Sequence, residues 1–210
     1  MKNILIHGLG QNEVSWNKVE EELKSNNIKI ETPSLYLMLK DITSDYDTLY
    51  KQFIKYCNGF DEKLNLCGLS LGGILALHYA KEFPDKVNSL ILIGTPYKVP
   101  KFLFKVKGLI FKIMPRSTFE KIGCEKKDFI FLVNSMSNLD IERNLDKITC
   151  KTLILCGVKD NQNLESAKLL NKSINNSSFK TINNSSHEVN VDNPKELASI
   201  IYKFWKDRGN

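Results

Sequence analysis

The stretch Gly68-Leu69-Ser70-Leu71-Gly72 places a serine in the pattern G-x-S-x-G. An apolar run, 64–67, comes before it, and a longer apolar run, 71–83, begins within it. A serine at a tight turn between a strand and a helix is held strained and exposed, and small residues two positions away prevent collisions in the turn. The pattern alone is suggestive, but its place between a predicted strand and a predicted helix indicates a nucleophile. We therefore predict that Ser70 attacks an acyl carbonyl.

A serine hydroxyl is a weak nucleophile near neutral pH and needs an adjacent base. The chain has three histidines, His7, His78 and His187. His78 lies two turns beyond Ser70 on the same predicted helix, so we interpret it as structural. His187 lies in a loop between the last predicted strand and the last predicted helix, where it can reach the serine turn. A lone loop histidine is more often a surface residue, but the serine turn and the carboxylate described next favour His187 as the base.

The base in turn needs a carboxylate that fixes its tautomer and stabilises the imidazolium. Asp160 lies in the turn after the apolar run 153–156, so its loop neighbours the loop of His187. The turn at 94–97 offers no carboxylate, and Asp192 is too close to His187 in sequence to orient it. Asp160 is thus predicted by position and by elimination, although an isolated aspartate there would be interpreted as a polar turn residue.

Short apolar runs alternate with longer runs of helical spacing along most of the chain. This alternation predicts right-handed strand–helix–strand units and a parallel sheet covered by helices on both faces. The predicted strands lie at 3–7, 28–31, 64–67, 87–93, 152–156 and 179–182, and the predicted helices at 13–24, 42–57, 71–83, 164–173 and 194–206.

One stretch departs from this alternation, since no convincing strand begins between Ile93 and Lys151. Residues 98–147 are too many for a plain crossover and are rich in aromatic and aliphatic groups. We predict a mainly helical insertion of the kind that forms a lid or a binding element, with extra core helices as the alternative. The predicted organisation is a core of residues 1–97 and 148–210 with residues 98–147 as a cap.

Ser70, Asp160 and His187, in this order and at the ends of successive strands, resemble the α/β-hydrolase superfamily. The resemblance covers residues 3–205. It implies the α/β-hydrolase fold, with about six mostly parallel strands, helices on both faces and a helical cap insertion. We expect the family's N-terminal antiparallel hairpin to be missing, and the first two strands to lie on the same side of the third.

The turn His7-Gly8-Leu9-Gly10 is similar to that family's H-G-x-G turn. The resemblance implies that the backbone N–H groups of Leu9 and Leu71 form an oxyanion hole. Fixed donors aimed at a developing oxyanion are worth about 3 kcal/mol each, and the dipole of a helix N-terminus also favours an anion. We expect the side chain of His7 to support the turn rather than to transfer a proton.

The predicted function is that of a serine hydrolase of the carboxylesterase type, which cleaves an ester with an apolar acyl or alcohol group through an acyl-enzyme. The residues predicted to line its substrate pocket are Phe102, Phe104, Phe111 and Met114. No metal ion or organic cofactor is implied. A thioesterase, an amidase or a C–C bond hydrolase would use the same triad, and a non-catalytic ligand-binding protein on this scaffold is a further alternative.

The composition is that of a single globular domain, with 210 residues, 42% of them hydrophobic and 26% charged. The net charge of +6 comes mainly from lysines spread along the chain, which favours a solvated surface over nucleic-acid binding. Five cysteines form no C-x-x-C pair, and their odd number argues against a disulfide framework. We expect Cys67 and Cys156 to be buried.

No apolar run approaches the roughly 20 residues that span a bilayer. The N-terminal apolar stretch is too short for a signal peptide, so we expect a cytoplasmic protein. Residues 98–107 are both basic and apolar, and we expect at most a weak contact of this part of the cap with an anionic membrane surface. The predicted partner is a small-molecule ester, and no nucleic acid is expected.

Overall fold

A computed structural model describes residues 1–98, 111 and 113–207. Its centre is a five-stranded parallel sheet whose strand order follows the chain. The strands are β1 (Lys2–Ile6), β2 (Leu64–Leu69), β3 (Val87–Ile93), β4 (Lys151–Gly157) and β5 (Ser177–Ile182). The three inner strands are buried along almost their whole length because both faces of a parallel sheet are covered.

Of the about six strands that were expected, five form a sheet in the described part of the chain, and the run predicted at 28–31 does not form a strand. The run 28–31 contributes a single parallel bridge, in which Glu31 pairs with Ile4 of β1. This run alternates isoleucine with charged residues and leads into Pro33, which has no N–H to donate to a ladder and restricts the residue before it. The expected position is confirmed, since the run lies beside β1 on the edge away from β2.

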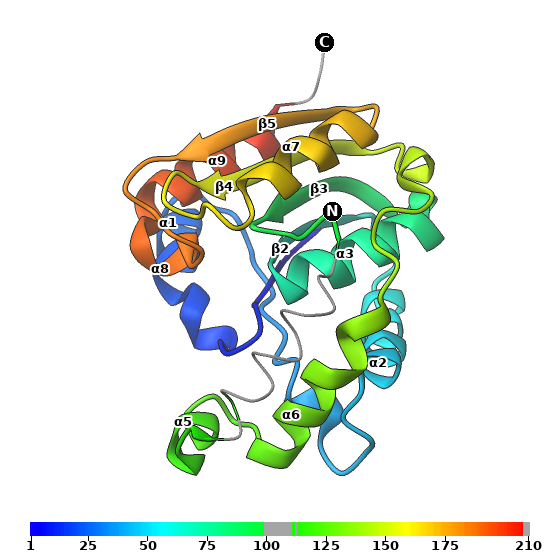
Figure 1. Ribbon diagram of the computed structural model, residues 1–210. Coiled ribbons are helices and arrows are strands. Elements are labelled where there is room, and N and C mark those ends of the chain that lie inside the picture. Colours follow the sequence, from blue (N-terminus) through cyan, green and yellow to red (C-terminus); the bar gives the residue numbers. More distant parts are fainter. Residues whose placement is uncertain (99–110, 112, 208–210) are drawn as a thin grey trace.

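Helices cover both faces of the sheet (Figure 1). Alternate residues of each strand point to opposite faces, so two apolar clusters form. One face is covered by α2 (Tyr46–Asn58), α3 (Leu71–Glu82) and α7 (Leu164–Ser173), and the other by η1 (Glu13–Trp16), α1 (Asn17–Ser25) and α9 (Pro194–Lys206). Three predicted helices are confirmed almost to the residue, and the one predicted at 42–57 begins later, at Tyr46, where Asp45 caps the N–H of Thr48.

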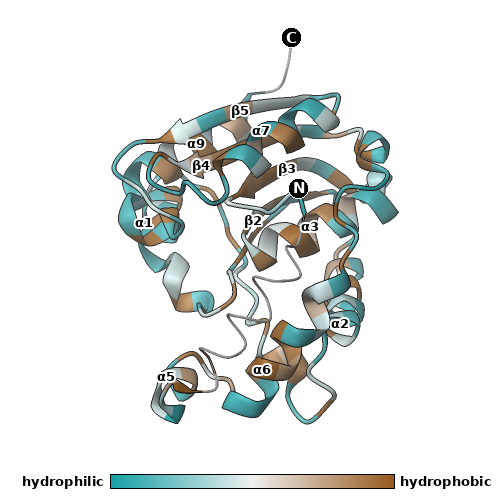
Figure 2. Ribbon diagram, viewed as in Figure 1, coloured by the Kyte–Doolittle hydropathy of each residue, from teal (hydrophilic) through white to brown (hydrophobic). Residues whose placement is uncertain are grey.

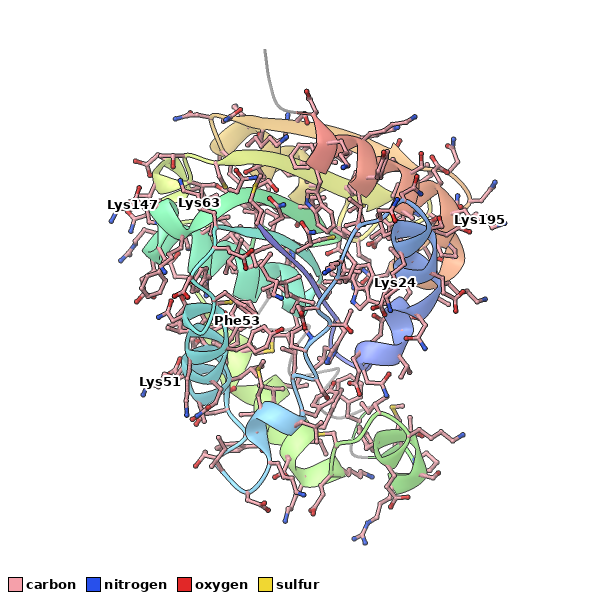
Figure 3. The ribbon with its side chains drawn as sticks, turned by 180° about the vertical axis from the view of Figure 1, so that it is seen from behind. Lys24, Lys51, Phe53, Lys63, Lys147 and Lys195 are labelled. Atoms are coloured by element: carbon pink, nitrogen blue, oxygen red, sulfur yellow. The ribbon has the colours of Figure 1, made fainter. Side chains whose placement is uncertain are left out.

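The distribution of side chains agrees with this layering. Figure 2 shows hydrophobic residues along much of β3 and β4 and on the sheet-facing sides of the helices, whereas the edge strand β5 is more hydrophilic. From α2, Phe53 points inward and meets Tyr79 of α3 edge to face at 6.0 Å, whereas Lys51 points outward (Figure 3). Cys67 and Cys156 are fully buried, as expected, and all five cysteines are free.

The described part of the predicted insertion is mainly helical. It contains α5 (Arg116–Glu120), α6 (Lys126–Ser135) and the short turns η4 (Met136–Asn138) and η5 (Leu145–Lys147). Phe119 and Phe129 join the same apolar cluster as α2 and α3, and the N–H of Tyr46 donates to Oγ of Ser135 at 2.8 Å. In Figure 1, α5 and α6 lie below the sheet, with α6 beside α2. The role of residues 98–147 as a cap stays a prediction.

Three short elements complete the described chain: η2 (Leu37–Leu39), η3 (Pro84–Lys86) and α8 (Val189–Asp192). Within residues 1–98, 111 and 113–207, no helix has the length and apolar character needed to cross a bilayer. Most of the stretch expected to touch a membrane surface, residues 99–107, lies outside the described residues.

Candidate active site

Ser70 stands at the junction between β2 and α3 with φ 51° and ψ −110°. A positive φ is strained for a residue with a side chain, and such strain is typical of an exposed nucleophile. The N–H of Ser70 donates to the carbonyl of Ile93 in β3 at 2.9 Å, which ties the turn to the neighbouring strand. A Cβ on Gly72 would lie 2.3 Å from the carbonyl oxygen of Ile6, so only glycine lets the turn approach the sheet this closely.

Asp160 and His187 are hydrogen-bonded to each other. Asp160 follows β4, His187 follows β5, and Nδ1 of the imidazole lies 2.8 Å from Oδ2 of the carboxylate. Burial would raise the pKa of Asp160, but hydrogen bonds from His187 and Asn163 outweigh it and hold that pKa below its ordinary value. The carboxylate is therefore charged at neutral pH and accepts the Nδ1 proton, which leaves Nε2 of His187 as the basic nitrogen.

Asn163 is a further partner of this carboxylate, and the sequence analysis missed it. Its Nδ2 donates to both oxygens of Asp160, at 2.9 and 3.0 Å, and lies 3.2 Å from Nδ1 of His187. Asn163 precedes α7 and is three residues beyond Asp160, a spacing at which side chains often fold back onto a turn. This three-residue spacing from Asp160 is the feature of the sequence that points to Asn163. The amide holds the carboxylate in the orientation that faces the imidazole.

The backbone at Gly94, directly after β3, brings the predicted triad together. Gly94 has φ 51°, and a Cβ there would lie 3.0 Å from Nδ1 of His187 and 3.3 Å from Oδ2 of Asp160. The preceding residue, Ile93, accepts the N–H of Ser70, so all three predicted residues surround one stretch of β3. Among the described residues no hydrogen bond joins the Ser70 hydroxyl to the imidazole. Such bonds are often long without substrate.

The turn after β1 lies against Ser70, since a Cβ on Gly8 would be 3.5 Å from the Cβ of Ser70. Leu9 follows in this turn and packs at the edge of the apolar cluster. Leu71 is the first residue of α3, so its N–H has no partner within the helix. The two residues predicted to supply oxyanion donors thus flank Ser70 from the turn after β1 and from the start of α3.

His7 supports this turn, in agreement with the sequence interpretation. Its Nδ1 lies 2.9 Å from the carbonyl oxygen of Gly8, and its Nε2 lies 3.0 Å from the N of Leu35. Because Leu35 can only donate, Nε2 accepts, and Nδ1 carries the proton and donates to Gly8. Burial lowers the pKa of His7, so the imidazole is neutral and both nitrogens are engaged with backbone.

The predicted substrate contacts are described only in part. Phe111 meets Phe129 of α6 edge to face at 5.0 Å, and Met114 packs at the edge of the same cluster. Phe102 and Phe104 lie outside the described residues. Contact of all four with a substrate stays a prediction.

His78 and Asp192, the alternatives considered for the base and the carboxylate, have structural partners. His78 lies with Nδ1 2.7 Å from the hydroxyl of Tyr46, and Asp192 accepts from the N–H and the hydroxyl of Ser186 at 2.7 and 2.5 Å. Across the described ranges, no group of three or more His, Cys, Asp or Glu side chains is arranged to hold a metal ion.

Comparison with known proteins identifies the fold. A family profile described as alpha/beta hydrolase fold matches residues 53–118. Monoacylglycerol lipase ABHD6 of Mus musculus is 26% identical over 199 residues, which cover 73% of this chain but 58% of that protein. The Homo sapiens protein of the same name is 24% identical, covering 96% of this chain and 74% of that protein.

Two solved structures are similar over nearly the whole chain. An esterase from Thermogutta terrifontis has a TM-score of 0.80 at 21% identity and covers 99% of this chain and 90% of that one. MenH from S. aureus has a TM-score of 0.83 at 19% identity, with coverage of 100% and 95%. At these identities the structural likeness establishes the fold, which is the one that the sequence analysis expected.

Proposed function

We propose that this chain, which has the α/β-hydrolase fold, is a serine hydrolase that cleaves a carboxylic ester through an acyl-enzyme. Ser70 is the nucleophile, His187 the general base and acid, and Asp160 the residue that orients His187. The observation that carries the proposal is the Asp160–His187 hydrogen bond of 2.8 Å, formed around Gly94 beside the strained Ser70.

The mechanism follows from the two nitrogens of His187. Nδ1–H is held by the charged Asp160, so Nε2 removes the proton of Ser70 as the hydroxyl attacks the ester carbonyl. The N–H groups of Leu9 and Leu71 bind the oxyanion that forms. His187 then protonates the leaving alcohol, and water hydrolyses the acyl-enzyme by the same steps.

The relatives support an ester with an apolar acyl chain as the substrate. Two of them are named monoacylglycerol lipases, and a monoacylglycerol is an ester of glycerol with one acyl chain. Phe111 and Met114, in the described part of the predicted cap, would extend an apolar surface for such a chain. We therefore propose a carboxylesterase or lipase activity.

Replacing the nucleophile is the direct test. Ser70→Ala is expected to lower kcat on p-nitrophenyl esters by about 10⁴-fold or more, because the remaining groups cannot form the acyl-enzyme. A fluorophosphonate probe is expected to label the wild-type chain at Ser70, as read by peptide mass spectrometry. Rates measured over a series of acyl lengths will give the size of the acyl pocket.

The matched control is Ser89→Ala, which removes a fully buried serine near the opposite end of β3. Its kcat is expected to stay within about twofold of wild type, since surface and core changes remote from a site act mainly on stability. Turnover that survives Ser70→Ala would contradict the proposal, as would a wild-type chain that neither turns over esters nor takes the label.

A further inference from the structure

Two buried amide side chains join the loops that the proposed mechanism uses. Gln11 lies two residues beyond Leu9 in the turn after β1, and Asn190 lies three residues beyond His187 in α8. Nε2 of Gln11 donates to Oδ1 of Asn190 at 3.2 Å, and Nδ2 of Asn190 donates to Oε1 of Gln11 at 3.1 Å. The two residues are 179 positions apart in sequence.

Both side chains of this reciprocal pair are buried, which favours one arrangement of the pair. Gln11 is 4% exposed and Asn190 is 1% exposed. A buried amide that loses its hydrogen-bond partner is left desolvated and unpaired, so each side chain strongly favours the arrangement in which the other is present. Asn190 also donates to the carbonyl of Ser15 at 3.1 Å, which ties α8 to the segment that continues from the turn.

Other residues of the turn after β1 are hydrogen-bonded to a different part of the chain. The N–H of Gly10 donates to the hydroxyl of Tyr36 at 3.0 Å, and His7 bridges the turn to Leu35. These contacts fix the turn to the segment at 35–36. The Gln11–Asn190 pair instead fixes it to α8, which follows the loop of His187 and, as a four-residue helix, is too short to be rigid by itself.

We infer that the Gln11–Asn190 pair is a positioning device that sets the oxyanion turn at Leu9 relative to the base His187. The inference rests on the proposed function and extends it to two residues that touch no reacting atom. Acyl transfer needs the base and the oxyanion donors placed together around one tetrahedral carbon, and a misplacement of about 1 Å costs roughly 100-fold in rate.

Alanine variants of each residue and of both test the inference. Gln11→Ala and Asn190→Ala are each expected to lower kcat by about 10- to 100-fold while KM changes by less than about threefold. The double variant is expected to lose no more than the worse single variant, because the two residues act as one pair. Affinity for a trifluoromethyl ketone, whose adduct places an oxyanion in the hole, is expected to fall in parallel with kcat.

Asn65→Ala is the control for a loss of stability alone. Asn65 is a 4% exposed amide at the opposite end of the sheet, where it is bonded to Asn3, Asn88 and Ser89. This variant is expected to lower the melting temperature about as much as the pair variants while kcat stays near wild type. Should the alanine variants fail to fold, Gln11→Asn combined with Asn190→Gln keeps the summed side-chain length and is expected to recover kcat relative to either change alone.

The outcomes separate this inference from the proposed function. The inference is overturned if the pair variants keep kcat within about twofold of wild type, or if their losses multiply in the double variant. It is also overturned if Asn65→Ala loses as much kcat as the pair variants, or if the length-swapped variant recovers no kcat. In those cases the wild type still turns over esters in a Ser70-dependent way. A wild-type chain without turnover or labelling overturns the proposed function, and the inference with it.

Discussion

At the scale of single residues, Gly94 is a position where the site leaves little room for a side chain. It has φ 51°, and its missing side chain leaves room for the imidazole of His187 and the carboxylate of Asp160. A methyl group there would meet Nδ1 and Cε1 of His187 at 3.0 Å, which is closer than carbon and ring atoms normally approach. The hydrogen bond that orients the imidazole therefore depends on a residue that takes no part in the chemistry.

We expect Gly94→Ala to lower kcat at least about 10-fold, because the added methyl group displaces the imidazole from Asp160. It should also lower the free energy of unfolding by about 1–2 kcal/mol through the positive φ. Gly123→Ala is the control, since Gly123 has φ 77° and a Cβ there meets nothing within 4 Å. Equal losses of kcat in the two variants, measured with thermal unfolding in parallel, would contradict this account.

At the scale of elements, a histidine links the helices on one face of the sheet. His78 of α3 is bonded to Tyr46 of α2, and Tyr50 packs edge-on against its ring at 5.8 Å. Burial, and then the charge of Lys81, lower the pKa of His78 from 6.5 to about 4, while the carbonyl and the charge of Asp140 act in the opposite direction. The helix contact is therefore built for a neutral imidazole.

This lowered pKa predicts a loss of stability in acid. Above pH 6.5 neither the folded nor the unfolded chain protonates His78, and between about pH 6.5 and 4 only the unfolded chain does. The free energy of unfolding should therefore fall across that window as pH falls, by up to about 3 kcal/mol, since one pKa unit corresponds to about 1.4 kcal/mol. His78→Gln, which removes the titration, should flatten the curve when denaturant unfolding is followed at each pH.

Part of the slope will survive in His78→Gln because burial lowers the pKa of His7 in the same direction. An unchanged slope in the variant would show that His78 does not carry the effect. The comparison uses stability rather than activity, so it is independent of the proposed function.

At the scale of the whole molecule, lysines of the described residues come from several different elements. The net charge is +6, and Lys24, Lys51, Lys63, Lys147 and Lys195 point outward from separate parts of the fold (Figure 3). A nucleic-acid surface needs basic groups gathered along one face so that several phosphates are neutralised together. This arrangement instead favours a solvated surface.

We accordingly expect no discrete complex with double-stranded DNA or with single-stranded RNA at about 150 mM salt in a mobility-shift assay, while weak smearing at low salt would reflect net charge alone. A salt-resistant, sequence-dependent complex would refute the interpretation of the lysines as solvated surface.

Local patterns in the chain were enough to predict the types of most elements and the edge of the sheet at which Ser70, Asp160 and His187 lie. Periodicity, turn residues and the rule that parallel strands end at one edge are local signals, and they were sufficient for this. The strand predicted at 28–31 does not form, because a short run before Pro33 depends on how many ladder partners it finds, which no local pattern reports.

The polar contacts that support the predicted triad emerge only when the chain is folded. Three such contacts follow no sequence periodicity. They are the bond from Asn163 to Asp160, the close approach of Gly94 to His187, and the pairing of Gln11 with Asn190 across 179 positions. A buried amide and a solvated one look alike in a sequence, because what distinguishes them is the partner that folding brings within hydrogen-bond distance.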